Sequence, residues 1–88
     1  MVRLRVVVSG RVQGVVFRDS CRRQAERHGV AGWVRNADDG SVVAELEGDP
    51  DLVQAVLAWM HHGPEHAQVR DVAVTEVAET GERGFAVR

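Results

Sequence analysis

The stretch GRVQGVVFR at positions 10–18 contains residue types that could bind an oxyanion. It follows an apolar run and precedes an arginine-rich segment, so it forms the joint between a predicted strand and a predicted helix. Free N–H groups at a helix start, turned inward by Gly10 and Gly14, would form a concave anion nest. Arg18 would lean back over that nest and grip two anion oxygens. A glycine-rich turn with a surface arginine fits these residues equally well.

The chemistry of this segment differs from that of a nucleotide-binding loop. No Gly-Lys-Ser/Thr sequence follows the glycines, and no acid of the kind that holds Mg²⁺ beside a nucleotide is supplied nearby. The segment therefore implies a phosphate site without a metal.

Periodicity around the segment predicts an α+β chain. Phe17, Cys21 and Ala25 recur four residues apart before Gly29, which indicates a helix with one packed stripe. Asp49 and Pro50 are suited to the N-cap and first position of a second helix. The predicted elements are a strand over 3–10, a helix over 17–28, a hairpin of strands over 30–36 and 41–48, a helix from 50 to about 62, a strand over 69–77 and a short strand over 84–88.

This βαββαβ order with one extra strand predicts a ferredoxin-like fold. In that plan two helices cover one face of an antiparallel sheet, and residues 1–88 form a single domain. The first two strands run in the same direction with one strand between them, about 9–10 Å apart. Asn36 ends the second strand at the edge where the loop ends the first. An asparagine that opens the run NADDG is also a common turn residue.

Two motifs resemble those of the acylphosphatase family. The first is Gly-x-Val-Gln-Gly-Val-x-Phe-Arg, whose fixed places are filled by residues 10–18. The second is glycine, an aromatic, a small apolar residue, any residue and asparagine, followed at set distances by further Gly and Val. It is filled by Gly32, Trp33, Val34, Asn36, Gly40, Val42 and Gly48. The resemblance covers nearly all of residues 4–88.

The resemblance implies hydrolysis of acyl phosphates to a carboxylate and inorganic phosphate, with no cofactor, no metal and no phosphoenzyme. Arg18 would bind the phosphoryl group, and Asn36 would position the attacking water. Ala37 departs from the family pattern, because many relatives place a hydroxyl residue beside the asparagine. The implied phosphate-binding loop consists of Gln13, Gly14, Val15, Val16, Phe17 and Arg18.

Composition sets the remaining expectations. All 11 basic residues are arginine, they are spread along the chain, and 13 acids leave a net charge of −2, which argues against a nucleic-acid groove. No apolar stretch approaches about 18 residues, and the first residues lack the apolar region of a signal peptide. One cysteine cannot form an internal disulfide. We expect a cytoplasmic monomer that acts on a small molecule and contacts neither a membrane nor nucleic acid.

Other constellations suggest different chemistry. Cys21 and Arg27 match the Cys-x5-Arg spacing of tyrosine phosphatases, but the intervening residues favour a helix, so we expect Cys21 in the core. His61, His62 and His66 suggest a metal site only weakly. Trp33 could stack on RNA, although a place in the core or against the loop is the better expectation.

A non-catalytic binding or regulatory module is the main alternative function, because ferredoxin-like domains host many activities. An acylphosphatase-like domain can also serve as one part of a larger carbamoyl-transfer protein. Nothing obvious in the sequence selects the acyl end of a substrate, so we expect a broad substrate range.

Overall fold

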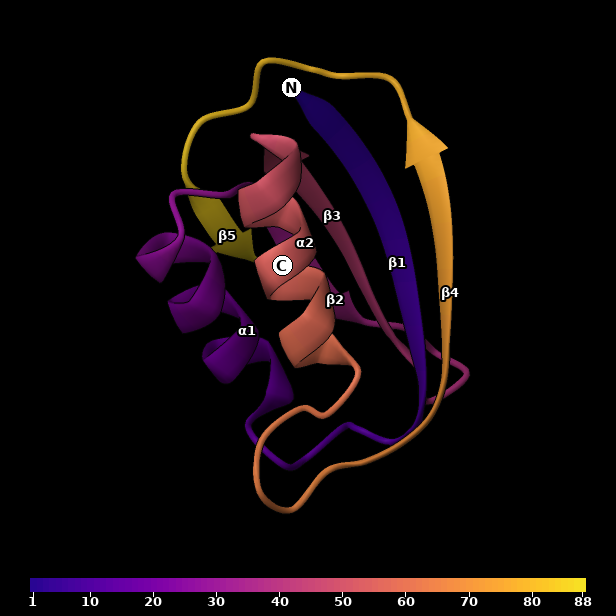
Figure 1. Cartoon of the computed structure of the whole chain (residues 1–88). Helices are drawn as coiled ribbons and strands as arrows, with labels where there is room; N and C mark the ends of the chain where they lie inside the picture. The colour runs from indigo at the N-terminus through magenta and orange to yellow at the C-terminus, as the bar shows by residue number, and fades with distance from the viewer.

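The computed structural model describes residues 1–88 as a five-stranded sheet with two helices on one face (Figure 1). This arrangement confirms the ferredoxin-like prediction. In chain order the elements are β1 (Val2–Arg11), α1 (Phe17–Arg27), β2 (Ala31–Asn36), β3 (Val42–Gly48), α2 (Pro50–Met60), β4 (Gln68–Val77) and β5 (Phe85–Val87).

The strand order across the sheet is β4-β1-β3-β2-β5. β1 pairs antiparallel with β3 and β4, and β2 pairs antiparallel with β3. β1 and β2 therefore run in the same direction with β3 between them, as the sequence predicted.

One detail of the prediction was wrong, because the sheet is mixed. β5 pairs parallel with β2 at the edge opposite β4. β4 ends at the end of the sheet where β1 and β2 begin, and the connection over residues 78–84 crosses that end to the far edge (Figure 1). The chain enters β5 beside the start of β2, so the two strands share a direction.

The core lies between the helices and the sheet. The alternating Leu4, Val6 and Val8 of β1 are buried there, together with Val42, Ala44 and Leu46 of β3. Phe17, Cys21 and Ala25 form the buried stripe of α1, and Val53, Val56, Leu57 and Met60 form that of α2. Asp49 caps α2 by accepting a hydrogen bond from the N–H of Asp51 (3.2 Å). The hydrophobic periodicities in the sequence therefore identified the packed faces of these four elements.

The face of the sheet without helices also buries charged residues. Arg3 is only 2 % exposed, and its guanidinium donates to Glu45 (2.7 Å), Glu47 (2.8 Å) and Glu82 (2.9 Å). Glu47 also accepts from the N–H groups of Thr80 (2.8 Å) and Gly81 (2.9 Å). Hydrogen bonds therefore fix the β4–β5 connection to this face.

Trp33 lies on the same helix-free face. It is buried, as expected, but it is outside the main core and on the opposite side of the sheet from the loop before α1. The guanidinium carbons of Arg35 and Arg88 lie 5.5 Å and 5.3 Å from its ring centroid. The expectation that Trp33 is buried is therefore confirmed, but its place on β2 turns it to the helix-free face, so it neither joins the main cluster of buried residues nor supports the loop.

Candidate functional site

The segment between β1 and α1 is held by its apolar side chains. Val12 and Phe17 are buried, and Val15 packs partly against the core. Between these anchors the backbone turns through positive φ angles at Gly14 (73°) and Val16 (56°). A β-branched residue rarely adopts this conformation, and such strain persists only where the surrounding structure imposes it. The buried anchors on either side supply that constraint.

The backbone N–H groups from Gln13 to Arg18 donate no hydrogen bond within the protein. The first helical bond runs from the N–H of Ser20 to the carbonyl oxygen of Val16 (3.0 Å). Val16 is the N-cap residue of α1, and no side-chain cap bond forms there. Successive free amides at the positive end of a helix are suited to binding an anion.

The Gln13 side chain ties this segment to the β2–β3 turn. Its Nε2 donates to the carbonyl oxygens of Ala37 (2.8 Å) and Ser41 (2.9 Å). The sequence predicted Gln13 as part of a phosphate-binding loop. In the structure its side chain holds this loop in place against the β2–β3 turn. Ala37 takes part through its backbone carbonyl, so its missing hydroxyl does not affect this tether.

Asn36 is the last residue of β2 and faces the helices. Its pairing partner on β3 is the buried Val42, and partners in an antiparallel ladder share a face. The Asn36 Oδ1 atom is buried and has no hydrogen-bond partner. A buried polar atom without a partner is costly in an ordinary structural position, so this oxygen makes Asn36 a candidate functional residue.

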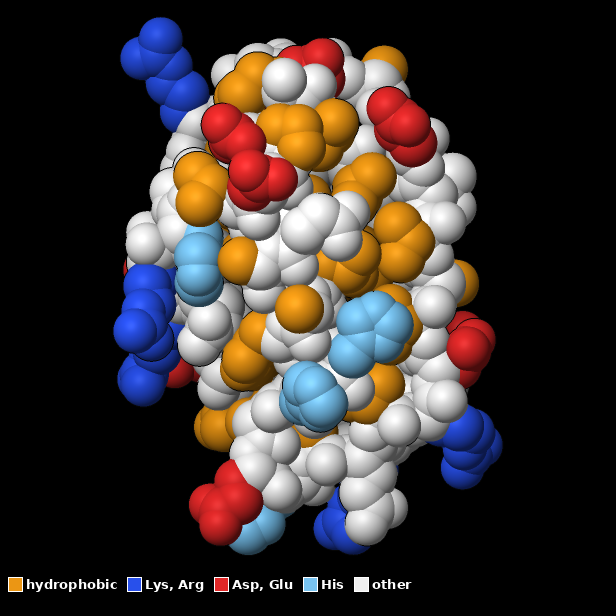
Figure 2. All heavy atoms as spheres, viewed as in Figure 1, with side chains coloured by type: hydrophobic (Ala, Val, Ile, Leu, Met, Phe, Trp, Pro, Cys, Tyr) orange, Lys and Arg blue, Asp and Glu red, His pale blue; other side chains and the backbone are white.

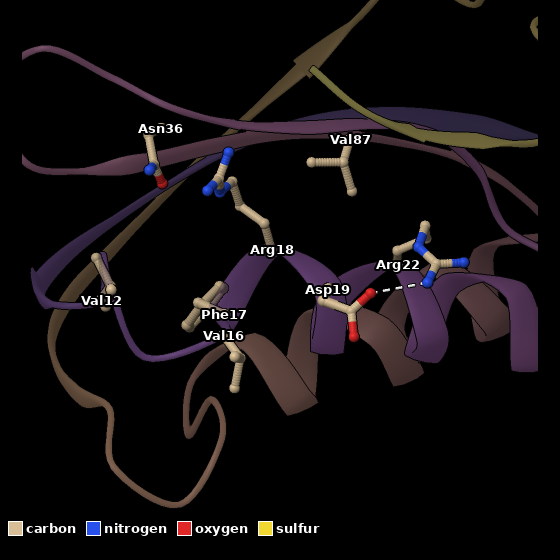
Figure 3. A pocket seen from close by; sticks show the side chains of 9 residues that line it. Val12, Val16, Phe17, Arg18, Asp19, Arg22, Asn36 and Val87 are labelled. Carbon is tan, nitrogen blue, oxygen red and sulfur yellow. Dashed lines mark hydrogen bonds and ion pairs between the residues drawn. The ribbon is translucent and has the colours of Figure 1, made fainter.

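A pocket of about 580 Å³ lies between the loop and the end of β2. Figure 3 shows the guanidinium of Arg18, which rises from the first turn of α1, pointing toward Asn36. Arg18 is exposed and forms no ion pair with an acidic residue. Of the residues predicted from the sequence, the pocket brings together Gly14, Val16, Phe17, Arg18 and Asn36, whereas Gln13 and Val15 do not line it.

Val12, which belongs to the 10–18 stretch singled out in the sequence, also lines the pocket, whereas three further lining residues were not predicted from the sequence: Asp19, Arg22 and Val87. Asp19 and Glu26 stand three and four residues from Arg22 in the sequence, and on a helix these spacings favour ion pairs. The structure has both pairs, Arg22–Asp19 (2.7 Å) and Arg22–Glu26 (3.1 Å). The hydrogen bond from Arg22 lowers the pKa of Asp19. Val87 could not be found without knowing that β5 pairs with β2.

Cys21 is completely buried in the stripe of α1. Burial raises the pKa of its thiol to about 12, so the reactive thiolate is scarce near neutral pH. The expectation that Cys21 is a core residue is confirmed.

The histidines near the end of α2 are not gathered into a metal-binding group. No set of three or more His, Cys, Asp or Glu side chains lies close enough together to hold a metal ion. Figure 2 shows the histidines spread over the helical face of the molecule.

Neither helix has the length and apolar character that a membrane-crossing helix requires.

Comparison with known proteins connects this geometry to one family. A sequence model of the acylphosphatase family matches residues 4–87. The chain is 58 % identical to an acylphosphatase of Rubrobacter xylanophilus over 98 % of this chain and 79 % of the relative. It is similar to the crystal structure of acylphosphatase from Bacillus subtilis, with a TM-score of 0.97 and 36 % identity over 100 % of this chain and 99 % of that chain.

A similar fold also occurs inside a much longer protein. The crystal structure of HypF from T. kodakarensis matches all of this chain with a TM-score of 0.87 and 27 % identity, but the match covers only 12 % of the HypF chain. In HypF this fold is therefore one part of a larger chain.

Proposed function

Because the chain belongs to the acylphosphatase family, we propose that it hydrolyses acyl phosphates by direct in-line attack of water on phosphorus. The observation that carries this proposal is one pocket lined by loop residues whose backbone amides are unbonded, by Arg18, which has no ion pair, and by Asn36, whose Oδ1 has no hydrogen-bond partner. The products are a carboxylate and inorganic phosphate.

Binding begins with the phosphoryl group. Its oxygens accept hydrogen bonds from the free amides of the loop, while the planar guanidinium of Arg18 donates to two of them. These donors are held in place before the substrate arrives, since Val12 and Phe17 anchor the backbone and Gln13 ties it to the next turn. Such preorganised donors stabilise the charge on the equatorial oxygens in the transition state.

Asn36 orients the nucleophile. Its Oδ1 accepts a hydrogen bond from the attacking water, which directs a lone pair of the water toward phosphorus. The new water–phosphorus bond forms while the bond from phosphorus to the acyl oxygen breaks, and the carboxylate leaves with the bonding electrons. Both water protons initially remain on the phosphate product as H₂PO₄⁻.

The reaction needs little acid–base catalysis. A carboxylate leaving group has a conjugate acid with a pKa of about 4, so it departs without protonation. In a loose, metaphosphate-like transition state the attacking water must be aligned with phosphorus, but it need not be deprotonated first. The proposal therefore includes no phosphoenzyme and no metal, and the buried Cys21 takes no part.

We place the protein in the cytoplasm as a monomer. The single cysteine is buried and unpaired, so folding requires no oxidising compartment. One cluster of 16 buried residues accounts for the main core. Gel filtration at micromolar concentration should give the mass of one 88-residue chain.

The central test is hydrolysis of a synthetic acyl phosphate in the presence of a chelator, with inorganic phosphate added as an inhibitor. We expect turnover that the chelator does not reduce and competitive inhibition by phosphate, because the product carries the same phosphoryl oxygens. Binding of phosphate without any turnover would instead support a non-catalytic module.

A further inference from the structure

We infer that the pocket beyond Arg18 receives the acyl group, and that Val87 makes this subsite favour uncharged, apolar acyl groups. The inference rests on the proposed function, because it assigns the remaining half of the same pocket. It narrows the substrate class, for which the sequence offered no selective feature.

The direction of attack places the acyl group. In an in-line displacement the attacking and leaving oxygens lie on opposite sides of phosphorus. In Figure 3 Asn36 is drawn on one side of the Arg18 guanidinium, and Val87, Asp19 and Arg22 are drawn on the other. We infer that phosphorus, bound by the loop and by this guanidinium, lies between the two groups. A water oriented by Asn36 therefore expels the carboxylate toward Val87 and the ion pair on α1.

Val87 provides an apolar surface in this half of the pocket. It pairs with Val34 in the parallel β2–β5 ladder, so its side chain lies on the helical side of the sheet. Phe85, two residues earlier on the same face, packs against the core and holds the strand in place. Val87 is 42 % exposed, which leaves area for a bound acyl group to cover.

The charged residues around Val87 include no cation that is free to pair with a second anionic group on the substrate. The Arg22 guanidinium already contacts the carboxylates of Asp19 (2.7 Å) and Glu26 (3.1 Å). Arg18, the unpaired cation of the pocket, is occupied by the phosphoryl group in the proposed complex. A carboxylate on the acyl group would compete with Asp19 and Glu26 for Arg22, so uncharged acyl groups should bind better.

The chain supplies a matched control for Val87. Val74 is 43 % exposed and lies on β4, the opposite edge strand, outside the pocket. We would compare Val87→Ser, Val87→Leu and Val74→Ser with the original chain, using acetyl phosphate and benzoyl phosphate as substrates. Circular dichroism and thermal melting would verify that each variant is folded.

Val87→Ser should lower kcat/KM for benzoyl phosphate by about three- to tenfold and that for acetyl phosphate by less than about twofold, the size expected when the contact with a half-exposed apolar group is lost. Val87→Leu should retain or raise the preference for benzoyl phosphate, and Val74→Ser should leave it unchanged. Equal losses on both substrates, or an unchanged ratio in folded Val87→Ser, would overturn the subsite.

A second comparison needs no variant. 4-Carboxybenzoyl phosphate adds one carboxylate to the same ring and should show a lower kcat/KM than benzoyl phosphate with the original chain. Equal or faster hydrolysis of the carboxylated substrate would contradict the inferred preference. Failure of the original chain to hydrolyse any of these substrates would instead refute the proposed function.

Discussion

Arg18 is the residue on which phosphoryl binding depends most directly. Arg18→Ala should reduce kcat/KM by about 10²–10³-fold, the loss seen when one preorganised donor to a developing charge is removed. The inhibition constant of inorganic phosphate should rise as well. Steady-state kinetics with an acyl phosphate measures both effects.

Arg23→Ala is the matched control, because Arg23 lies on the same helix but outside the pocket, with a largely exposed side chain that pairs with Asp19 (3.1 Å). It removes the same charge and should change kcat/KM by less than about threefold, because exposed ion pairs contribute little. Equal losses in both variants would show that helix charge, rather than the position of Arg18, governs binding.

Asn36 should affect the rate more than substrate binding. Asn36→Ala removes the oxygen that orients the water, so kcat should fall by about tenfold to a hundredfold while KM changes little. Asp38→Ala, an exposed neighbour in the same turn, controls for disturbance of the β2–β3 connection. A rise in KM with unchanged kcat would assign Asn36 to ground-state binding instead.

At the scale of elements, the tether from Gln13 joins the loop before α1 to the turn after β2. Gln13→Ala removes both bonds to backbone carbonyls and should lower the free energy of unfolding by about 1–3 kcal/mol. The loop would also lose its fixed place beside Asn36, so kcat/KM should fall. Urea denaturation and the hydrolysis assay measure the two effects.

The exposed Gln54 on α2 provides a control of the same residue type. Gln54→Ala should leave both the free energy of unfolding and kcat/KM nearly unchanged. An equally active Gln13→Ala variant would mean that the apolar anchors alone position the loop.

The sequence revealed the elements and the ends of the strands that meet at the site. Of the two glycines expected to bracket the turn, Gly14 lies in the loop before α1, whereas Gly10 is still part of β1. Gly10 lies at a bulge in the pairing with β4, where a Cβ atom would collide with the neighbouring strand, and Gly14 takes a positive φ. Phe17, Cys21 and Ala25 marked the packed face of α1 because helical periodicity is a local property.

The features that the sequence did not reveal depend on long-range pairing. Val87 enters the pocket only because β5 crosses to the far edge and joins β2, and a three-residue strand carries little local signal. The burial of Arg3 and Trp33 on the helix-free face was not predicted for a related reason. Alternation tells the two faces of a strand apart, but it does not show that the second face is also covered.

At the scale of the whole molecule, the charged network on the helix-free face should make stability depend on pH. Hydrogen bonds from the Thr80 N–H and from Arg3 lower the pKa of Glu47 to about 2, from an ordinary value of 4.5. Because the folded-state pKa is depressed, the stabilisation is fully present above about pH 4.5 and is lost as the pH falls toward 2. Chemical denaturation at several pH values between 6 and 2 measures this decline.

Glu47→Gln should make that decline shallower, because the residue no longer titrates. It should also lower stability near neutral pH, since Arg3 would lose a buried ionic partner. Glu65→Gln, which removes an exposed carboxylate without an ion pair, should leave the pH profile unchanged. Asp19 and Asp39 also have lowered pKa values, so part of the acid sensitivity should remain in Glu47→Gln.

The buried thiol of Cys21 can be used to measure the rate at which the protein opens or unfolds. An alkylating reagent can reach this thiol only when α1 separates from the sheet or the chain unfolds, so the labelling rate followed by mass spectrometry reports those events. Phosphate bound at the N-terminus of α1 would stabilise the folded state, in which Cys21 is buried, and would slow labelling in proportion to its occupancy. Occupancy of the loop could then be measured in the resting protein, without any turnover.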